Sequence, residues 1–215
     1  MIARFGVRPS WCGIAGLKVS VATLLTVACV LGGSDYARAQ SGVSGSVHGD
    51  TALHQAAHSG DVLSLRRELD QGVDPDTTNR FGVTPLALAS RGGHGAVVQL
   101  LLESGADPNH ASPTGETPLM VAARTGVVES VASLLEHGAD PLARESWMGQ
   151  TALMWAAAER HTSVVAPLVA GGAEVDSRSD AGFTPLMFAT RLGHIETVDA
   201  LLDAGADIHQ TLPDG

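Results

Sequence analysis

Cysteine is scarce in this chain and is absent from most of it. The 215 residues include only Cys12 and Cys29, both within the first 39 positions. Residues 40–215 therefore hold neither a disulfide framework nor a thiol that could act as a nucleophile. Charged residues make up 17% of the chain and hydrophobic ones 44%, a balance that is typical of a folded protein.

Basic residues are also few, and lysine is nearly missing. Lys18 is the only lysine. Of the 13 basic and 23 acidic residues of the chain, 9 and 22 lie in residues 40–215, which gives this part a formal net charge of −13. Such a surface repels phosphate backbones, so we expect no binding to nucleic acid.

No apolar run is long enough to span a membrane. The uncharged stretch Val19–Ser34 falls short of the roughly 20 residues that a spanning helix needs. Basic residues precede this run, and the small residues Ala37 and Ala39 follow it. This order predicts a secretory signal peptide in residues 1–39, cleaved after Ala39, and hence an exported protein, either periplasmic or secreted.

The leader has two alternative interpretations, both less favoured. A retained membrane anchor would need a longer run. A lipid-bearing Cys29 would need a large aliphatic residue three positions earlier, where Thr26 stands. Residues 40–48 are rich in glycine and serine and are predicted to be a flexible linker. Ser44 in this segment lacks the strand-turn-helix context of a nucleophile elbow.

A seven-residue motif recurs along the rest of the chain. It is written "TALHQAA", "TPLALAS", "TPLMVAA", "TALMWAA" and "TPLMFAT", and it begins at Thr51, Thr84, Thr117, Thr151 and Thr184. A glycine stands two residues before each threonine, and another follows it by 21 residues. Five repeats therefore start near residues 49, 82, 115, 149 and 182, and residues 213–215 would start a sixth.

Each repeat has room for two short helices. The threonine can cap the first helix, and the proline that often follows suits its first position. The second helix carries an apolar stripe at helical spacing, which in repeat five is Ile195, Val198, Leu201 and Leu202. A glycine in the left-handed conformation then closes it. Helices this short cannot bury such a stripe alone, so the pattern predicts an all-α solenoid of stacked repeats.

The period, the Thr-Pro-Leu motif, the paired alanines and the "LLxxGAD" ending resemble ankyrin repeats. The resemblance covers residues 49–212 almost without interruption, and it defines a repeat domain over residues 49–215. It implies a turn or hairpin followed by two antiparallel helices in each repeat, stacked into a slightly curved array. It also implies a role in binding other proteins.

Three repeats depart from the pattern. Repeat one holds Glu68 in a leucine position, as expected of an end repeat whose outer face meets water. Repeat four has Arg160 in place of the glycine between its helices, Thr162 in the aliphatic column, Pro167 in its second helix and one extra residue before it. A proline in a helix interior lowers stability by about 3 kcal/mol, so we predict that repeat four has the lowest local stability in the array. Repeat five keeps its apolar stripe, and we expect the chain to be the N-terminal part of a longer protein or the product of a truncated gene model.

The candidate catalytic and metal-binding residues are weak. The stretch "HQAAH" places His54 and His58 four residues apart with Asp61 nearby, a spacing that suits a metal. Two histidines without a firm third ligand make a poor site, and the resemblance implies a structural role for His54 near the turn. Histidines also recur ten residues after the threonine in repeats two, four and five, at positions 94, 161 and 194, which indicates a shared structural role. We expect no enzyme activity, no metal ion and no cofactor.

Partner binding is predicted at the hairpin tips and at the exposed ends of the first helices, which the resemblance places on one concave face. The candidate residues are arginines, aromatics and their neighbours at these positions, namely Arg80, Phe81, Arg91, Arg124, Trp147, Met148, Gln150, Phe183 and Arg191. Arginine and aromatic side chains often dominate interface energies. We predict that the column of Arg91, Arg124 and Arg191 meets an acidic patch on the partner. In the alternative, the arginines only solvate helix ends, and the two phenylalanines fold onto their own turns.

The sequence thus predicts a non-catalytic adaptor that binds another exported protein. Two alternatives share the same fold. The repeats could be the targeting module of a longer protein whose catalytic domain lies beyond Gly215, or the protein could be a secreted effector.

Overall fold

The structure, a computed structural model, describes residues 49–212. The predicted signal peptide, the predicted linker and the start of a sixth repeat lie outside these residues. Within them the chain forms five pairs of α-helices. The pairs are α2 (Ala52–Ser59) with α3 (Val62–Asp70), α4 (Pro85–Gly92) with α5 (Gly95–Glu103), α6 (Pro118–Thr125) with α7 (Val128–Glu136), α8 (Ala152–Ala158) with α9 (Val165–Ala170), and α10 (Pro185–Leu192) with α11 (Ile195–Asp203).

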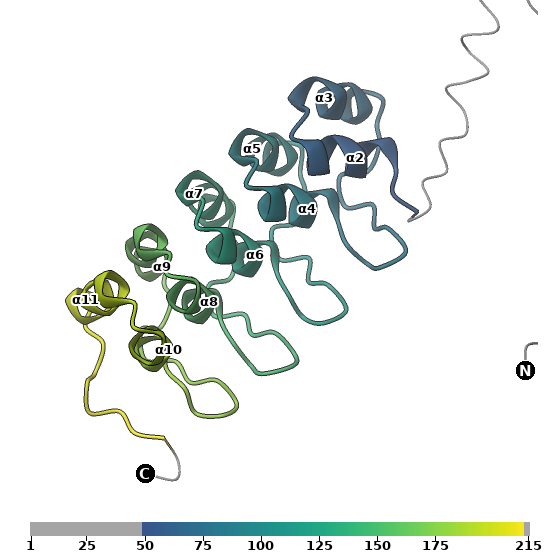
Figure 1. Cartoon of the computed structure of the whole chain (residues 1–215). Helices are drawn as coiled ribbons and strands as arrows, with labels where there is room; N and C mark the ends of the chain where they lie inside the picture. Colours follow the sequence, from purple (N-terminus) through teal and green to yellow (C-terminus); the bar gives the residue numbers. More distant parts are fainter. Residues whose placement is uncertain (1–48, 213–215) are drawn as a thin grey trace, which may run out of the picture. The chain divides into compact units, whose positions relative to one another are not determined.

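The helices stack in two layers. The first helices α2, α4, α6, α8 and α10 contact one another in chain order, and so do the second helices α3, α5, α7, α9 and α11. Figure 1 shows the loops between repeats projecting on the side of the first helices, away from the second helices. This arrangement confirms the predicted all-α solenoid, and it places every loop tip beside the end of a first helix.

The core lies between the layers. The leucine two residues after each threonine is buried, as is the leucine of the second helices. These leucines are Leu53, Leu86, Leu119, Leu153 and Leu186 in the first layer, with Leu101, Leu134, Leu168 and Leu201 in the second. Each contributes about 1.5–3 kcal/mol by leaving water. Glu68, which takes the leucine position in repeat one, keeps part of its side chain exposed, as predicted for an end repeat.

The first helices begin as the motif predicts. The hydroxyl oxygen of Thr51, Thr84, Thr117, Thr151 and Thr184 accepts a hydrogen bond from the backbone N–H three residues later. Proline occupies the first turn in repeats two, three and five. Both features satisfy or remove backbone donors that a helix start would leave unpaired.

The apolar stripe predicted for repeat five is only partly buried. Leu201 is fully buried, whereas Ile195 is 70% exposed and Leu202 is also exposed. In repeat three the equivalent of Leu202 is Leu135, which lies directly against Gly171 of repeat four. Among the described residues, nothing follows repeat five to cover Ile195 and Leu202 in the same way.

Repeat four places its proline near the start of a helix and not in its interior. Its second helical segment begins with a 3₁₀ turn, Thr162–Val164, and α9 starts only at Val165. Pro167 therefore lies in the first turn of α9, where a backbone N–H would have no partner within the helix. The substitution of glycine by Arg160 is more costly, because this residue keeps the left-handed conformation, with φ of 64°.

Candidate partner-binding face

We call the hairpin tips and the exposed side chains of the first helices the tip face; the column of Arg91, Arg124 and Arg191 stands in the last turns of these helices. Its hairpins span residues 79–83, 112–116, 145–150 and 179–183. In the regular hairpins, a short polar side chain at the first position closes the turn. The side-chain oxygen of Asn79 accepts hydrogen bonds from the backbone N–H groups of Phe81 and Val83, and Ser112 and Ser179 act similarly.

The hairpin of repeat four is closed by a buried carboxylate. Glu145 is 6% exposed, and its two oxygens accept hydrogen bonds from the backbone N–H groups of Trp147, Met148 and Gln150. Burial by itself would raise the pKa of Glu145, but these three donors outweigh burial and hold the pKa below its ordinary value. The sequence prediction missed Glu145. The one-residue insertion was its signal, since a longer loop needs a longer side chain to close it.

This hairpin is also bonded to its neighbours on both sides. The backbone N–H of Ser146 donates to the carbonyl of Thr114 at 2.9 Å, and that of Asp180 donates to the carbonyl of Met148 at 2.9 Å. The guanidinium of Arg144 reaches the Asp180 carboxylate at 2.9 Å and the backbone carbonyl of Arg178 at 2.8 Å. The tip of repeat four is therefore fixed between repeats three and five.

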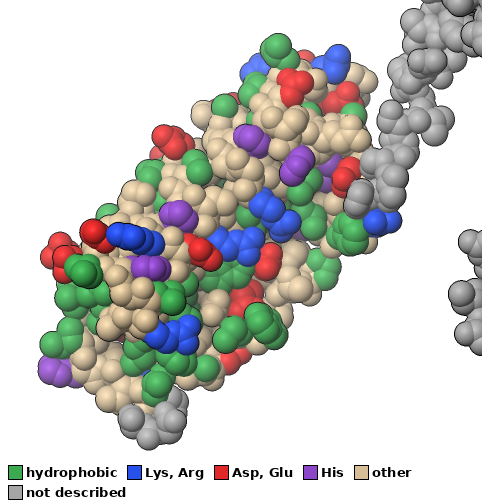
Figure 2. Space-filling model, viewed as in Figure 1, with side chains coloured by type: hydrophobic (Ala, Val, Ile, Leu, Met, Phe, Trp, Pro, Cys, Tyr) green, Lys and Arg blue, Asp and Glu red, His purple; other side chains and the backbone are tan. Residues whose placement is uncertain are grey.

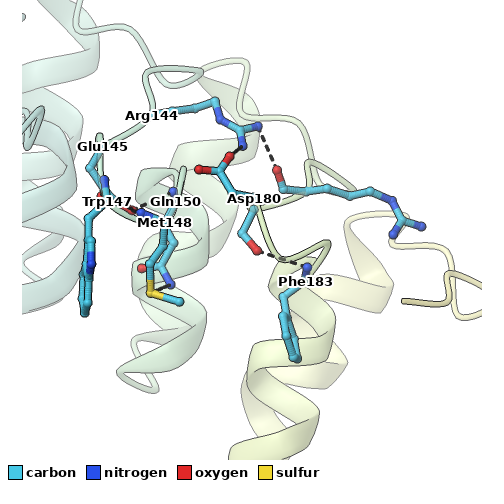
Figure 3. Close-up of polar contacts among 9 residues, drawn as sticks. Arg144, Glu145, Trp147, Met148, Gln150, Asp180 and Phe183 are labelled. Carbon is cyan, nitrogen blue, oxygen red and sulfur yellow. Dashed lines mark hydrogen bonds and ion pairs between the residues drawn. The ribbon is translucent and has the colours of Figure 1, made fainter. Parts of the chain in front are cut away.

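Figure 3 shows the side chains of Trp147, Met148 and Phe183 pointing to the same side of these hairpins. Trp147 is 84% exposed. Phe183 is half-buried and packs on Phe188 of α10, with ring centroids 5.5 Å apart. Of the two phenylalanines in the alternative interpretation, Phe183 packs within its own repeat, on α10, whereas Phe81 is 52% exposed.

Each arginine of the column has a partner within the array. The guanidinium of Arg91 lies 3.9 Å from the Glu116 carboxylate. Arg124 lies 4.7 Å from the centroid of the Trp155 ring. Arg191 lies over Phe183 and Phe188 at 5.3 and 5.7 Å, and in repeat two Arg80 lies 4.6 Å from Phe81. Such contacts contribute about 0.5–1 kcal/mol each at exposed sites, so these arginines are only partly available to a partner.

Three predicted residues meet in a groove between repeats three and four. Arg124, Trp147 and Gln150 line it, together with Thr114, Glu116, Glu145, Trp155, Ala158 and Glu159, and its volume is about 340 Å³. Phe183 and Arg191 line a second hollow in repeat five, beside Ile208 and Gln210. Arg80, Phe81, Arg91 and Met148 line neither hollow.

The groove is lined by more acidic than basic side chains. Three carboxylates line it, those of Glu116, Glu145 and Glu159, against the single guanidinium of Arg124. Figure 2 shows basic, acidic and hydrophobic side chains interleaved on the face in view, without a continuous basic stripe. The acidic patch on the partner stays a prediction, and within the groove Arg124 is the one basic side chain that could meet it.

His54 and the histidines at positions 94, 161 and 194 bond within the array, as predicted. His54 is fully buried; its ring bonds to the Thr51 hydroxyl at 2.8 Å and to the Val83 carbonyl of the next repeat at 3.0 Å. The rings of His94, His161 and His194 each bond to a backbone carbonyl near the end of the first helix of the preceding repeat. Within residues 49–212, no group of three or more histidines, cysteines or carboxylates could hold a metal ion.

In the same part of the chain, no helix has the length and apolar character needed to cross a membrane.

Comparison with known proteins places this arrangement in a family. A family model described as ankyrin repeats in three copies matches residues 53–145 and again residues 143–211. The potassium channel AKT3 of Oryza sativa subsp. japonica is 46% identical over 54 residues, which are 24% of this chain and 6% of the channel. This second likeness concerns a short segment only. The family model covers well over half of the chain, including all five helix pairs, and the chain therefore belongs to the ankyrin-repeat family.

Proposed function

We propose that this protein is a non-catalytic scaffold that binds another exported protein through the tip face. The proposal rests on the position of Trp147. This side chain is 84% exposed, and it stands on a hairpin that a buried carboxylate closes and that is bonded to both neighbouring hairpins. Large aromatic side chains on a fixed backbone bind well, because they bury much apolar area and lose little conformational freedom.

Family membership supports the general part of the proposal. Ankyrin repeats are in general protein interaction modules, and a shared fold by itself does not identify a partner. The specific part depends on the groove beside Trp147, where side chains from repeats three and four converge. A concave site that combines aromatic side chains with a few polar and charged groups is typical of binding sites.

The exported location is also a proposal, and the leader pattern of residues 1–39 supports it. A partner would then be found in the same compartment, either periplasmic or extracellular. The experiment is affinity capture from the exported fraction with the full chain as bait, followed by quantitative mass spectrometry.

Two variants make the capture specific to the tip face. Trp147→Ala is expected to lower the retention of the partner about tenfold or more, as for an interface hot spot. Leu63→Ala is the matched control, because Leu63 is 81% exposed but lies on α3, in the other helix layer. Equal retention of the same proteins by both variants would reject the tip face.

A third variant tests the charge of the partner. Changing Arg91, Arg124 and Arg191 together to glutamate makes the face more negative, so an acidic partner is lost and a basic partner is retained more strongly. Unchanged capture with an intact circular dichroism spectrum would show that the arginine column takes no part in binding.

A further inference from the structure

The groove between repeats three and four is sized for side chains and not for a folded domain. Its volume of about 340 Å³ is at the lower end of the range for small-ligand pockets. One wall is the hairpin of repeat four, whose insertion carries Trp147; the other comes from the hairpin and first helix of repeat three. An extended segment that inserts one or two side chains fits this space.

The floor of the groove is aromatic. Trp155 of α8 lies beneath the Arg124 guanidinium, 4.7 Å from ring centroid to guanidinium carbon, and the exposed Trp147 stands at the edge. Indole faces bind both apolar side chains and cations, because the ring combines a large apolar area with a negative face.

The rim of the groove is acidic, with a formal charge of −2 from three carboxylates and one guanidinium. Glu145 is fixed in its charged form by three backbone donors. Glu116 is only weakly paired with Arg91, at 3.9 Å. Glu159 is exposed and takes part in none of the ion pairs among the described residues. Glu116 and Glu159 are therefore available to a cation.

We propose that the groove binds an extended segment of the partner that carries an arginine or lysine next to an apolar residue. The basic group contacts Glu159, the apolar side chain lies against Trp147 and Trp155, and Glu116 at the opposite end of the groove adds to its negative charge. This inference rests on the proposed function, since it uses the same face, and it assigns the partner a charge opposite to the one predicted from the arginine column. We assign a positive charge to the partner's segment on the ground of charge complementarity. The arginines already have partners within the array, whereas Glu159 has none there.

The test uses a library of random heptapeptides selected on the immobilised full chain. The selected peptides are expected to be enriched in arginine or lysine beside an aliphatic or aromatic residue, relative to acidic residues. Affinity of the best peptide, measured by fluorescence anisotropy, should fall as salt rises. Selection of acidic peptides, or of none above background, would overturn the proposal.

Variants of the chain then assign the contacts. The double substitution Glu116→Gln with Glu159→Gln is expected to weaken the binding of the best peptide about fivefold or more, because it removes one charge contact and a second negative charge from the groove. Glu136→Gln at the end of α7 is the matched control and should leave the affinity unchanged. Arg124→Ala should tighten binding, because it uncovers Trp155 and makes the rim more negative; weaker binding with an intact fold would contradict the proposal.

Trp147→Ala separates the two proposals. If it weakens the peptide and the partner while the double glutamine variant has no effect, the face is correct and the basic segment is wrong. If neither variant changes the binding of peptide or partner, both the face and the segment are wrong.

Discussion

At the scale of single residues, Glu145 shows how one insertion changes a repeat. The regular hairpins are closed by asparagine or serine, whereas the longer hairpin of repeat four needs a glutamate that reaches three backbone donors. The insertion could be read from the spacing of 34 residues between Thr117 and Thr151. The spacing could not show that a buried carboxylate closes the longer loop, because the burial of Glu145 depends on repeats three and five lying on either side.

Glu145→Gln should lower the free energy of unfolding by about 1–3 kcal/mol at neutral pH, since an amide nitrogen would face a backbone N–H. The pKa of Glu145 is depressed below 4.5 in the folded state. Its contribution is therefore present above pH 4.5 and is lost as pH falls through the folded pKa. Urea unfolding should show that the difference in the free energy of unfolding between wild type and variant disappears over that acid range. Glu136→Gln, exposed on α7, should change little at any pH.

Arg160→Gly should stabilise the protein by about 0.5–1 kcal/mol. Arg160 holds a left-handed conformation that costs a residue with a Cβ about 1–2 kcal/mol, and its ion pair with Glu196 is exposed and weak. The reverse change, Gly126→Ala, should destabilise, because a Cβ at Gly126 would lie 2.3 Å from the His161 ring. Thermal unfolding of the two variants should shift in opposite directions.

At the scale of helices, repeat four has the most fragmented second element. α9 has 6 residues, whereas α5, α7 and α11 each have 9. The low local stability of repeat four, predicted from the sequence, stays a prediction. Hydrogen exchange should show faster exchange in α8 and α9 than in α6 and α7; equal protection of these helices would reject it.

The position of a proline within its helix decides how much it lowers the free energy of unfolding. Pro167 lies in the first turn of α9, so Pro167→Ala should change the free energy of unfolding by less than about 0.5 kcal/mol. Ser133 occupies the equivalent position in repeat three but lies in the interior of α7, and Ser133→Pro should cost about 3 kcal/mol. Chemical denaturation of both variants tests the comparison, and similar costs would contradict it.

At the scale of the whole molecule, the leader predicts processing. Cells that export the protein should release a chain that begins at Gln40, because cleavage is predicted after Ala39. Intact-mass measurement of the exported protein gives the first residue directly. A lipid-modified Cys29, or a chain that keeps residues 1–39, would contradict the cleavage. Ala39→Lys should leave a longer species, since a small residue is needed at the site.

The sequence by itself determined the repeats, their helices and the family. The recurring threonine, proline, leucine and glycine act within one repeat or between neighbours, so their spacing is sufficient to predict the caps, the buried leucines and the stacking. Only the tertiary structure decided which exposed residues act together. Arg124 lies over Trp155 of the next repeat, Arg91 lies near Glu116, and the hairpin that carries Trp147 is bonded to the hairpins on both sides. These contacts depend on how adjacent repeats are placed, and the proposal of a basic partner segment at the groove rests on that placement.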